Sequence, residues 1–512
     1  PSALRYGPPA RRTAPAATPR TTGYWRRLLP VLALLVLVTR IPSFRHLLWS
    51  PDEGYLAVQA RILADGGELY ETVVDRKPPL LPWLYETAFA LFGDESLYAM
   101  KALAALAHLL TAVLLAAVAR DRWGDRAGRI AGVLHPLLAT GLNPEDTQAA
   151  TFEVFILPFT VAAMWCAGRG RPGAAGLAVA GALLTKQTGG AVLVPVLWLL
   201  RHSAAHSARS GAGAGTAGRA GLPRLAAGLV LPVLGAALLT DPAGFLFWTV
   251  TGSAAYATFT GSELHVLFRG LANTALLCLA CAGLPASLVR ARRGTADLWV
   301  WLAASAVAVV AGFHFFGHYF LQLVPPLVLL ATAALRPLHP ERVASALLTS
   351  GCVCVLFLTW GLLAPRPELA HAQRLADSVR ALTAPADRIL VWGIHPETYW
   401  LADRTPASRY LTAGLLTNYS GGRDGPGVGE KYGVTGAWPV FTAELRDRPP
   451  ALIVDDSRGK PFAPDRLPTL RALLARHYEP LPATVDGAVF YVRSPGSARQ
   501  ETDALYGRPP GG

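Results

Sequence analysis

Two clusters of charged residues near the start of the chain combine residue types suited to acid–base and phosphate chemistry. Asp52 and Glu53 follow directly on the first long apolar run, and Arg76 and Lys77 stand before a pair of prolines. A carboxylate here could take a proton from a hydroxyl nucleophile while its neighbour orients it or binds a cation. A lysine ammonium suits phosphate as a point charge. Together the clusters predict a site for an anionic lipid head group.

Each cluster also has an ordinary structural interpretation. An Asp–Glu pair often caps the first turn of a helix, and a lysine at a membrane surface often extends its ammonium into water. Lysine is scarce, however, in a chain with 47 Lys and Arg residues, and it occurs only at Lys77, Lys101, Lys186, Lys431 and Lys460. Two of these, Lys77 and Lys186, fall at the predicted membrane edge beside acidic loops, which favours a phosphate contact for both.

Further acids lie close to apolar runs. Glu145 and Asp146 follow an Asn-Pro turn and could simply cap the next helix. Glu153 lies one turn into an apolar run, where a carboxylate is expected to line a polar cavity. With Tyr55 beside the acid pair and with His314, these residues are candidates for contacts with an acceptor or with the cavity wall.

Two histidines, His314 and His318, are four residues apart in an aromatic run that continues to Tyr319. On a helix this spacing would place both imidazoles on one face, where they could bind a metal ion. A contact with a phosphate or a sugar hydroxyl suits them at least as well, and His318 and Tyr319 are grouped with the phosphate-binding residues. The sequence assigns no metal ligand and leaves a divalent cation as the one open cofactor.

Composition indicates a membrane protein. The 512 residues are 52% hydrophobic and 16% charged, with a mean hydropathy of +0.33, whereas soluble domains carry about 25% charged residues. The net charge of +13 is spread in short clusters between apolar runs. Such clusters are typical of topogenic signals, and nucleic-acid binding is not expected. All five cysteines lie in apolar runs and are expected to be small buried hydrophobes.

The apolar runs predict an α-helical polytopic protein with about 11 transmembrane helices, near residues 28–48, 96–119, 127–142, 151–167, 174–185, 189–200, 225–240, 270–289, 297–313, 319–335 and 342–363. With a cytoplasmic N-terminus, the arginine-bearing connections all fall inside, as the positive-inside bias requires; they lie at 120–126, 169–171, 201–224, 290–293 and 336–342. The acidic, lysine and histidine candidates then fall outside. One orientation satisfies both sets.

The remaining segments define the domain organisation. Residues 1–27 form a Pro- and Arg-rich cytoplasmic N-terminus that is expected to be disordered. The membrane domain spans 28–364, with a first outer loop at 49–95 and a flexible cytoplasmic loop at 201–224. Strand-like runs at 388–393, 451–454 and 488–492 and a helical run at 467–477 predict a small extracytoplasmic α/β domain over 365–493. A disordered tail is expected over 494–512.

These motifs together resemble those of the GT-C glycosyltransferases, in particular the bacterial relatives of dolichyl-phosphate-mannose protein mannosyltransferase and of the lipid A aminoarabinose transferase (glycosyltransferase families 39 and 83). The resemblance extends from about residue 28 to 493. The order of the motifs and their placement on one face of the membrane are more specific than any single motif. It rests on the runs 52–55, 64–70 and 77–80 with Trp83, on Thr185-Lys186, on His318-Tyr319 followed by Pro325-Pro326, and on 387–393.

The resemblance implies a polyprenyl-phosphate sugar donor, an inverting transfer to a protein, lipid or glycan hydroxyl outside the cytoplasm, and an acid of the first outer loop as base. Carried over, Asp52 is the base, Glu53 its partner and Lys77 a contact of the donor phosphate; Arg76 and Lys186 add positive charge there. One departure concerns the position before the loop lysine. The aminoarabinose enzymes carry a carboxylate there, whereas this chain has Arg76. Arg76 argues against a metal ligand at this position and against aminoarabinose as the sugar.

Two other classes of function remain as alternatives. A transporter or lipid flippase would carry ionisable residues at mid-membrane and paired half-repeats with broken helices, whereas the acids here cluster at one surface. A non-catalytic scaffold would be favoured by a degenerate first loop, yet Asp52, Glu53 and Lys77 are all present. The sequence therefore predicts an integral plasma-membrane transferase, and its richness in Ala and Arg suggests a bacterial source.

Overall fold

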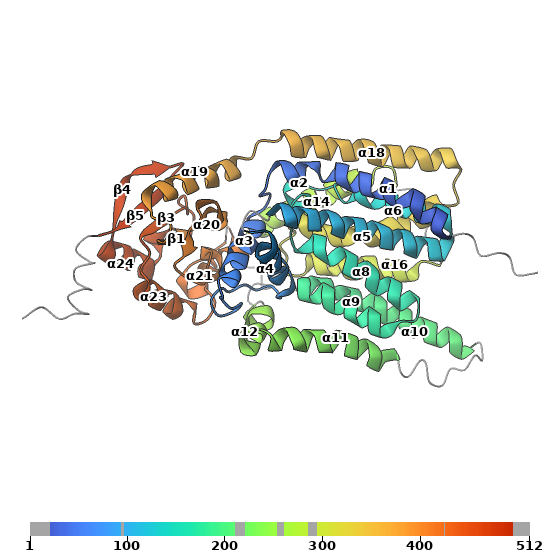
Figure 1. Cartoon of the computed structure of the whole chain (residues 1–512), viewed down its shortest axis with the longest axis horizontal. Helices are drawn as coiled ribbons and strands as arrows, with labels where there is room; N and C mark the ends of the chain where they lie inside the picture. Colours follow the sequence, from blue (N-terminus) through green and yellow to red (C-terminus); the bar gives the residue numbers. More distant parts are fainter. Residues whose placement is uncertain are drawn as a thin grey trace, which may run out of the picture.

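A computed structural model describes residues 21–93, 97–209, 221–252, 261–284, 294–423 and 425–494. A helical bundle forms one end of the molecule and a small α/β domain the other, with α3 and α4 between them (Figure 1). Within the described residues, five helical segments are long and apolar enough to cross a membrane: Leu97–Trp123, Gly221–Leu238, Glu263–Ala280, Gly317–Leu335 and Pro340–Leu382. Other apolar helices are shorter, so the prediction of about 11 spans is supported for these five.

Long helices build the bundle. They are α1 (Thr21–Thr39), α5 (Leu97–Trp123), α6 (Asp125–Leu138), α8 (Phe152–Gly168), α9 (Pro172–Thr185), α10 (Leu193–Arg209), α11 (Gly221–Leu238), α14 (Glu263–Ala280), α16 (Ala296–Val310), α17 (Val324–Leu335) and α18 (Pro340–Leu363), with the short α2 (Ile41–Arg45) after α1. Small residues let neighbouring backbones approach closely. An added Cβ on Gly228 of α11 would lie 2.2 Å from the carbonyl oxygen of Gly173 in α9.

Several predicted boundaries were wrong. Helix α1 begins at Thr21, so the N-terminal segment expected to be disordered to residue 27 is partly helical; residues 1–20 lie outside the described part. Helix α10 continues to Arg209 and α11 begins at Gly221, so both ends of the predicted flexible loop 201–224 are helical. Its remaining residues, 210–220, lie outside the described part of the chain. Residues 495–512 of the predicted tail are likewise outside the described residues.

The predicted first outer loop is largely helical. It contains α3 (Pro51–Ala64) and α4 (Leu80–Phe92). Helix α3 begins as expected from its sequence: the Ser50 side chain accepts a hydrogen bond from the Asp52 amide, Pro51 occupies the first turn, and two acids follow. Leu56, Ala57 and Ala60 of α3 pack into the core of the bundle, while Val58 and Leu63 pack into the core of the α/β domain.

Short elements line the space between the two ends: α7 (Pro144–Thr147), the 3₁₀ segments η1 (Gln187–Val192) and η3 (Gly317–Leu323), α12 (Pro242–Leu246) and the π-helical η2 (Phe247–Thr251). Irregular backbone at membrane depth is tolerated where it lines a cavity. These segments therefore mark the region in which a polar site can form.

The α/β domain holds a five-stranded sheet in the order β2-β1-β3-β5-β4. Its strands are β1 (Arg388–Trp392), β2 (Thr405–Pro406), β3 (Leu452–Asp455), β4 (Tyr478–Val485) and β5 (Ala488–Arg493). Strand β1 is parallel to β2 and β3, with Ile389 opposite Leu452, and β5 is antiparallel to β3 and β4. The three predicted strands are present as β1, β3 and β5, and β2 and β4 are additions.

Helices surround this sheet and connect it to the bundle. They are α19 (Pro367–Leu382), α20 (Glu397–Ala402), α21 (Ala413–Thr417), α22 (Tyr419–Gly422), η4 (Glu430–Tyr432), α23 (Ala437–Asp447), η5 (Pro464–Arg466) and α24 (Pro468–His477). Helix α19 follows α18 directly and leads from the bundle to the sheet (Figure 1). The predicted helix at 467–477 is α24.

Candidate active site

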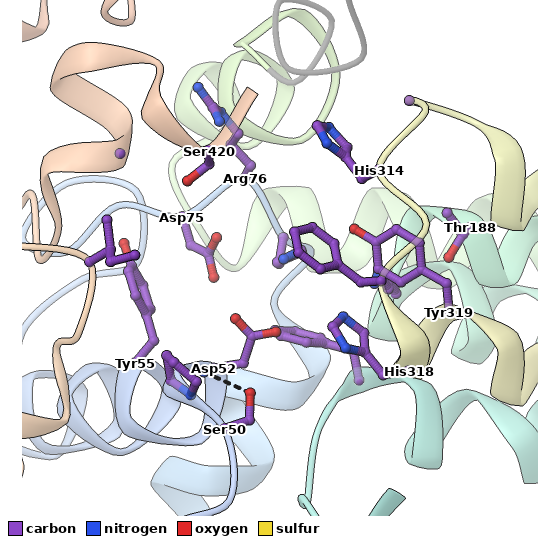
Figure 2. Close-up of a pocket in the computed structure, with 18 of the residues that line it drawn as sticks. Ser50, Asp52, Tyr55, Asp75, Arg76, Thr188, His314, His318, Tyr319 and Ser420 are labelled. Atoms are coloured by element: carbon purple, nitrogen blue, oxygen red, sulfur yellow. Dashed lines mark hydrogen bonds between the residues drawn. The ribbon is translucent and has the colours of Figure 1, made fainter. Parts of the chain in front are cut away.

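A cavity of about 910 Å³ lies between the bundle, α3 and the α/β domain. Its wall includes Ile394 and Ser420 of the α/β domain, opposite residues from the bundle. Most of the predicted site residues line it: Asp52, Tyr55, Arg76, Lys77, Glu145, Asp146, Lys186, His314, His318 and Tyr319. The exceptions are Glu53 and Glu153. The fold thus gathers residues that are far apart in the sequence around one space (Figure 2).

Asp52 stands in the first turn of α3. Its amide lies 3.3 Å from Ser50 Oγ, and its carboxylate points into the cavity (Figure 2). Among the described residues, none donates a hydrogen bond to this carboxylate. A carboxylate that faces a cavity with its oxygens available has the geometry required of a general base.

Glu53 is turned away from the cavity. Its side chain is fully buried and pairs with Lys101 Nζ of α5. The carboxylate also accepts hydrogen bonds from the amides of Trp49 at 2.7 Å and Ala150 at 2.5 Å. Glu53 therefore holds neighbouring segments together. It does not line the cavity beside Asp52. Lys101 was not among the predicted site residues.

Two lysines approach the cavity from different elements. Lys77 Nζ lies 4.8 Å from the centroid of the Phe152 ring, and Lys186 Nζ lies 4.0 Å from the centroid of the Tyr319 ring. Lys186 also forms an ion pair with Glu153, whose side chain is fully buried. Glu153 thus fixes Lys186 from behind instead of lining the cavity. The two ammonium groups are the positive charges that an anion at this wall would meet.

His314 and His318 do not share a helical face, which corrects that prediction. The backbone between the helices α16 and α17 is irregular: Phe313 and Phe315 have φ of 56° and 50°, and η3 begins only at Gly317. His318 Nδ1 lies 2.8 Å from Asp146 Oδ1. Within the described part of the chain, no three His, Cys, Asp or Glu side chains are grouped so that they could hold a metal ion.

Asp75 is a cavity residue that sequence reasoning missed. It precedes Arg76 and Lys77, and its carboxylate points into the space that Asp52 faces (Figure 2). Burial raises the pKa of this carboxyl, the Lys77 ammonium lowers it, and the Asp52 carboxylate raises it further. The signal that could have found it is the shared loop, because that loop also carries Lys77.

The loop that carries these residues is anchored by side chains that donate hydrogen bonds to its backbone carbonyls. Tyr55 Oη donates a hydrogen bond to the Val74 carbonyl at 2.6 Å, and Tyr70 Oη donates one to the Lys77 carbonyl at 2.8 Å. Gln187 Nε2 donates to the Arg76 carbonyl at 2.6 Å. The loop is therefore fastened on both sides of its charged residues, which fixes where their side chains begin.

Comparisons with known proteins agree with this arrangement. Residues 76–212 match the family described as dolichyl-phosphate-mannose-protein mannosyltransferase. The crystal structure of ArnT from Cupriavidus metallidurans bound to undecaprenyl phosphate is 16% identical with a TM-score of 0.60, and the match covers 93% of this chain and 99% of that one. The apo form of ArnT gives 17% identity and a TM-score of 0.61, with coverage of 93% and 98%.

A third structure, the Archaeoglobus fulgidus oligosaccharyltransferase tethered with an acceptor peptide, is 14% identical with a TM-score of 0.50, over 93% of this chain and 75% of that one. A comparison with curated protein sequences gives no match. The matched family and the matched structures are glycosyltransferases. The chain therefore resembles the GT-C membrane glycosyltransferases, in its fold over nearly its whole length and in its sequence over residues 76–212.

Proposed function

We propose that the protein transfers a sugar from a polyprenyl-phosphate donor, such as an undecaprenyl-phosphate sugar, to a hydroxyl acceptor at the outer face of the membrane. The observation that carries this proposal is the shared cavity: the Asp52 carboxylate faces the same space as the Lys77 and Lys186 ammonium groups. A base and a cationic site next to each other are what an acceptor hydroxyl and a phosphate leaving group require.

In this reaction the Asp52 carboxylate takes the proton of the acceptor hydroxyl as its oxygen attacks the anomeric carbon of the sugar. The bond from that carbon to the phosphate oxygen breaks, and its electron pair leaves with the phosphate. Attack from the side opposite the leaving group inverts the anomeric configuration. Lys77, Lys186 and Arg76 stabilise the charge that develops on the phosphate, since cations placed before the reaction need no reorganisation.

Other cavity residues have supporting roles in this proposal. His318 and Tyr319 flank Lys186 on the donor side, and the Asp146 carboxylate fixes the His318 ring. Tyr55, Glu145 and His314 are proposed to face the acceptor or the sugar. The α/β domain closes the cavity on that side, so its segment 412–423 is the acceptor-facing wall.

We further propose that the N-terminus is cytoplasmic and the α/β domain extracytoplasmic. This orientation rests on the positive-inside bias of the arginine-bearing connections; of these, 120–126, 169–171 and 336–342 lie within the described residues. Sugars linked to a membrane lipid are a donor form that is available where nucleotide sugars are absent.

The proposal is tested by sugar transfer in reconstituted vesicles, with a panel of polyprenyl-phosphate sugars and hydroxyl acceptors. We expect Asp52→Asn to lower turnover about 10²- to 10⁴-fold, as expected for loss of a general base, without affecting insertion. The matched control is Asp65→Asn, because Asp65 is exposed at the opposite end of α3. A parallel reaction in EDTA measures whether transfer needs a divalent cation. Absence of transfer by the wild type with every donor would refute the proposed function, and full activity of Asp52→Asn would refute the base.

A further inference from the structure

Glu53 is the meeting point of three segments that are separate in the sequence. Its carboxylate accepts hydrogen bonds from the Trp49 amide, before α3, and from the Ala150 amide, between α7 and α8. It also pairs with Lys101 of α5, and neither side chain of the pair is exposed at all. A buried carboxylate is retained only when donors compensate for its lost hydration. Here two backbone amides and one ammonium group provide that compensation.

The segments that meet at Glu53 carry residues that line the cavity. Helix α3 places Asp52 one residue before Glu53, and the segment before Ala150 carries Asp146, which holds His318. The hydrogen bond from the Ala150 amide therefore fixes the base relative to the donor side of the cavity. This bond joins the first turn of α3 directly to the segment before α8.

The same segment is held from its other side by a second buried cation. Arg40 donates hydrogen bonds to the Thr147 carbonyl and, at 2.9 Å, to the Gln148 carbonyl, and Ser43 Oγ donates to the latter at 2.6 Å. The carbonyl groups of this segment are thus bound by Arg40, whereas its Ala150 amide depends on Glu53. Lys101 is the ammonium that balances Glu53.

We propose that Lys101 is a positioning residue for the transfer reaction, acting on Asp52 through Glu53; this inference rests on the proposed role of Asp52 as base. Lys101 supplies the positive charge that lets the Glu53 carboxylate remain in a dry site and accept both amides. Lys101 is fully buried on α5, does not line the cavity and touches no substrate in the proposed reaction. Loss of its charge leaves the carboxylate without its counter-ion, so the first turn of α3 moves relative to the Asp146 wall.

A buried ion pair can also be purely structural, so the variants separate stability from positioning. Lys101→Met removes the charge and leaves Glu53 without its ion-pair partner. The double variant Lys101→Met, Glu53→Gln removes both charges, and a neutral pair in a buried site often restores stability. The double variant does not restore the original network, in which three donors bind one carboxylate. The ammonium donor is absent, and the introduced glutamine side chain offers a single acceptor oxygen. The matched control is Arg122→Met, which removes another ion pair of α5, to Asp297, at the end away from the cavity.

The experiment measures kcat and KM in the vesicle assay, together with binding of a polyprenyl phosphate and amide hydrogen exchange. We expect Lys101→Met to lower kcat at least tenfold, since a displacement of about 1 Å can cost 10²-fold in rate, with the donor KM and lipid binding within twofold of the wild type. The double variant should regain thermal stability but not kcat. Exchange should rise in residues 49–55 and 147–151, and Arg122→Met should leave kcat, the donor KM, lipid binding and exchange in these two segments unchanged.

Two results would overturn the inference. One is a Lys101→Met protein with wild-type kcat; the other is unchanged exchange in both segments, a result that does not depend on activity. Recovery of kcat together with stability in the double variant would also assign the pair a structural role only. An inactive wild type refutes the proposed function instead, and the exchange measurement then still decides whether Lys101 connects the two segments.

Discussion

Two carboxylates, Asp52 and Asp75, face one cavity from different segments of the chain. Asp52 belongs to the rigid first turn of α3, and Asp75 to the loop that also presents Lys77. Carboxylates that share a site do not ionise independently, because each negative charge disfavours the other. The proximity of Lys77 offsets this repulsion only in part, since burial still raises the pKa of Asp75 above its ordinary value.

This raised pKa predicts how Asp75 affects stability across pH. Above its ordinary value of 3.8 the unfolded chain loses the Asp75 proton while the folded protein keeps it, so stability falls as pH rises until the folded carboxyl also ionises. Asp75→Asn removes this pH-dependent loss of stability, because the asparagine side chain does not ionise. We expect the variant's thermal midpoint to decline less than that of the wild type as pH rises from 3.8 through the weakly acidic range.

The midpoint is followed by intrinsic tryptophan fluorescence in detergent over a pH series. Asp65→Asn, at the exposed end of α3, serves as the control and should follow the wild-type curve. Parallel curves for Asp75→Asn and the wild type would show that the Asp75 carboxyl does not carry the raised pKa.

The residue types of the site could be predicted from sequence, but their directions could not. Successive residues of a helix point about 100° apart, so the pair Asp52 and Glu53 must divide between two environments once α3 forms. Which of them faces the cavity depends on where α5 places Lys101, a contact between residues 48 positions apart. The prediction that His314 and His318 share a helical face was wrong for a related reason. The spacing argument assumed a helix where the backbone is irregular.

At the scale of elements, α3 connects the two ends of the molecule. Gly54 follows the acid pair and lies against the first turn of α20, where an added Cβ would lie 2.6 Å from Glu397 Cβ and 2.8 Å from Glu397 Cα. Only a residue without a side chain allows this approach. The spacing between α3 and the α/β domain, and thus the width of the cavity beside Asp52, is set by Gly54.

Gly54→Ala should therefore be destabilising. Alanine favours a helix over glycine by about 1 kcal/mol, but the added methyl group would overlap backbone atoms of α20, and overpacking costs about 1–3 kcal/mol. We expect a lower thermal midpoint and reduced transfer. Gly235→Ala in α11 is the matched control: nothing lies within 4 Å of its added Cβ, so its midpoint should be unchanged or higher. A Gly54→Ala protein as stable as the control would contradict this packing.

Elements with a clear apolar run were predictable, and those without one were not. Long apolar runs located the bundle helices, and short runs rich in β-branched and aromatic residues located β1, β3 and β5. Helix α4 was missed because Pro82 and Glu86 interrupt its 13 residues and because it lies inside a charged loop. Strand β4 was missed because most of its residues are exposed and two are prolines, Pro480 and Pro482; it is ordered by pairing with β5 at the edge of the sheet.

At the scale of the whole molecule, the cavity exists only because the α/β domain is docked on the bundle. The sequence predicted both parts and their order. It did not predict the docking, since the contacts join residues hundreds of positions apart. One of them lies where α18 passes into α19: Arg366 NH2 donates a hydrogen bond to the Trp49 carbonyl at 2.9 Å, and its guanidinium lies 4.1 Å from the centroid of the Trp49 ring. Trp49 is also the residue whose amide Glu53 binds.

Arg366→Lys tests whether this joint holds the two parts together. An arginine can stack on the indole and donate to the carbonyl at once, because its guanidinium is planar; a lysine keeps the charge but does not reproduce both contacts. We expect a loss of about 1 kcal/mol of stability, faster amide exchange in residues 46–55 and at the start of α19, and a higher KM for the acceptor. Arg374→Lys, in α19, alters an exposed ion pair with Asp486 of the turn between β4 and β5 and should leave all three near wild-type values. Equal behaviour of the two variants would mean that the charged joint at Trp49 does not hold the α/β domain to the bundle.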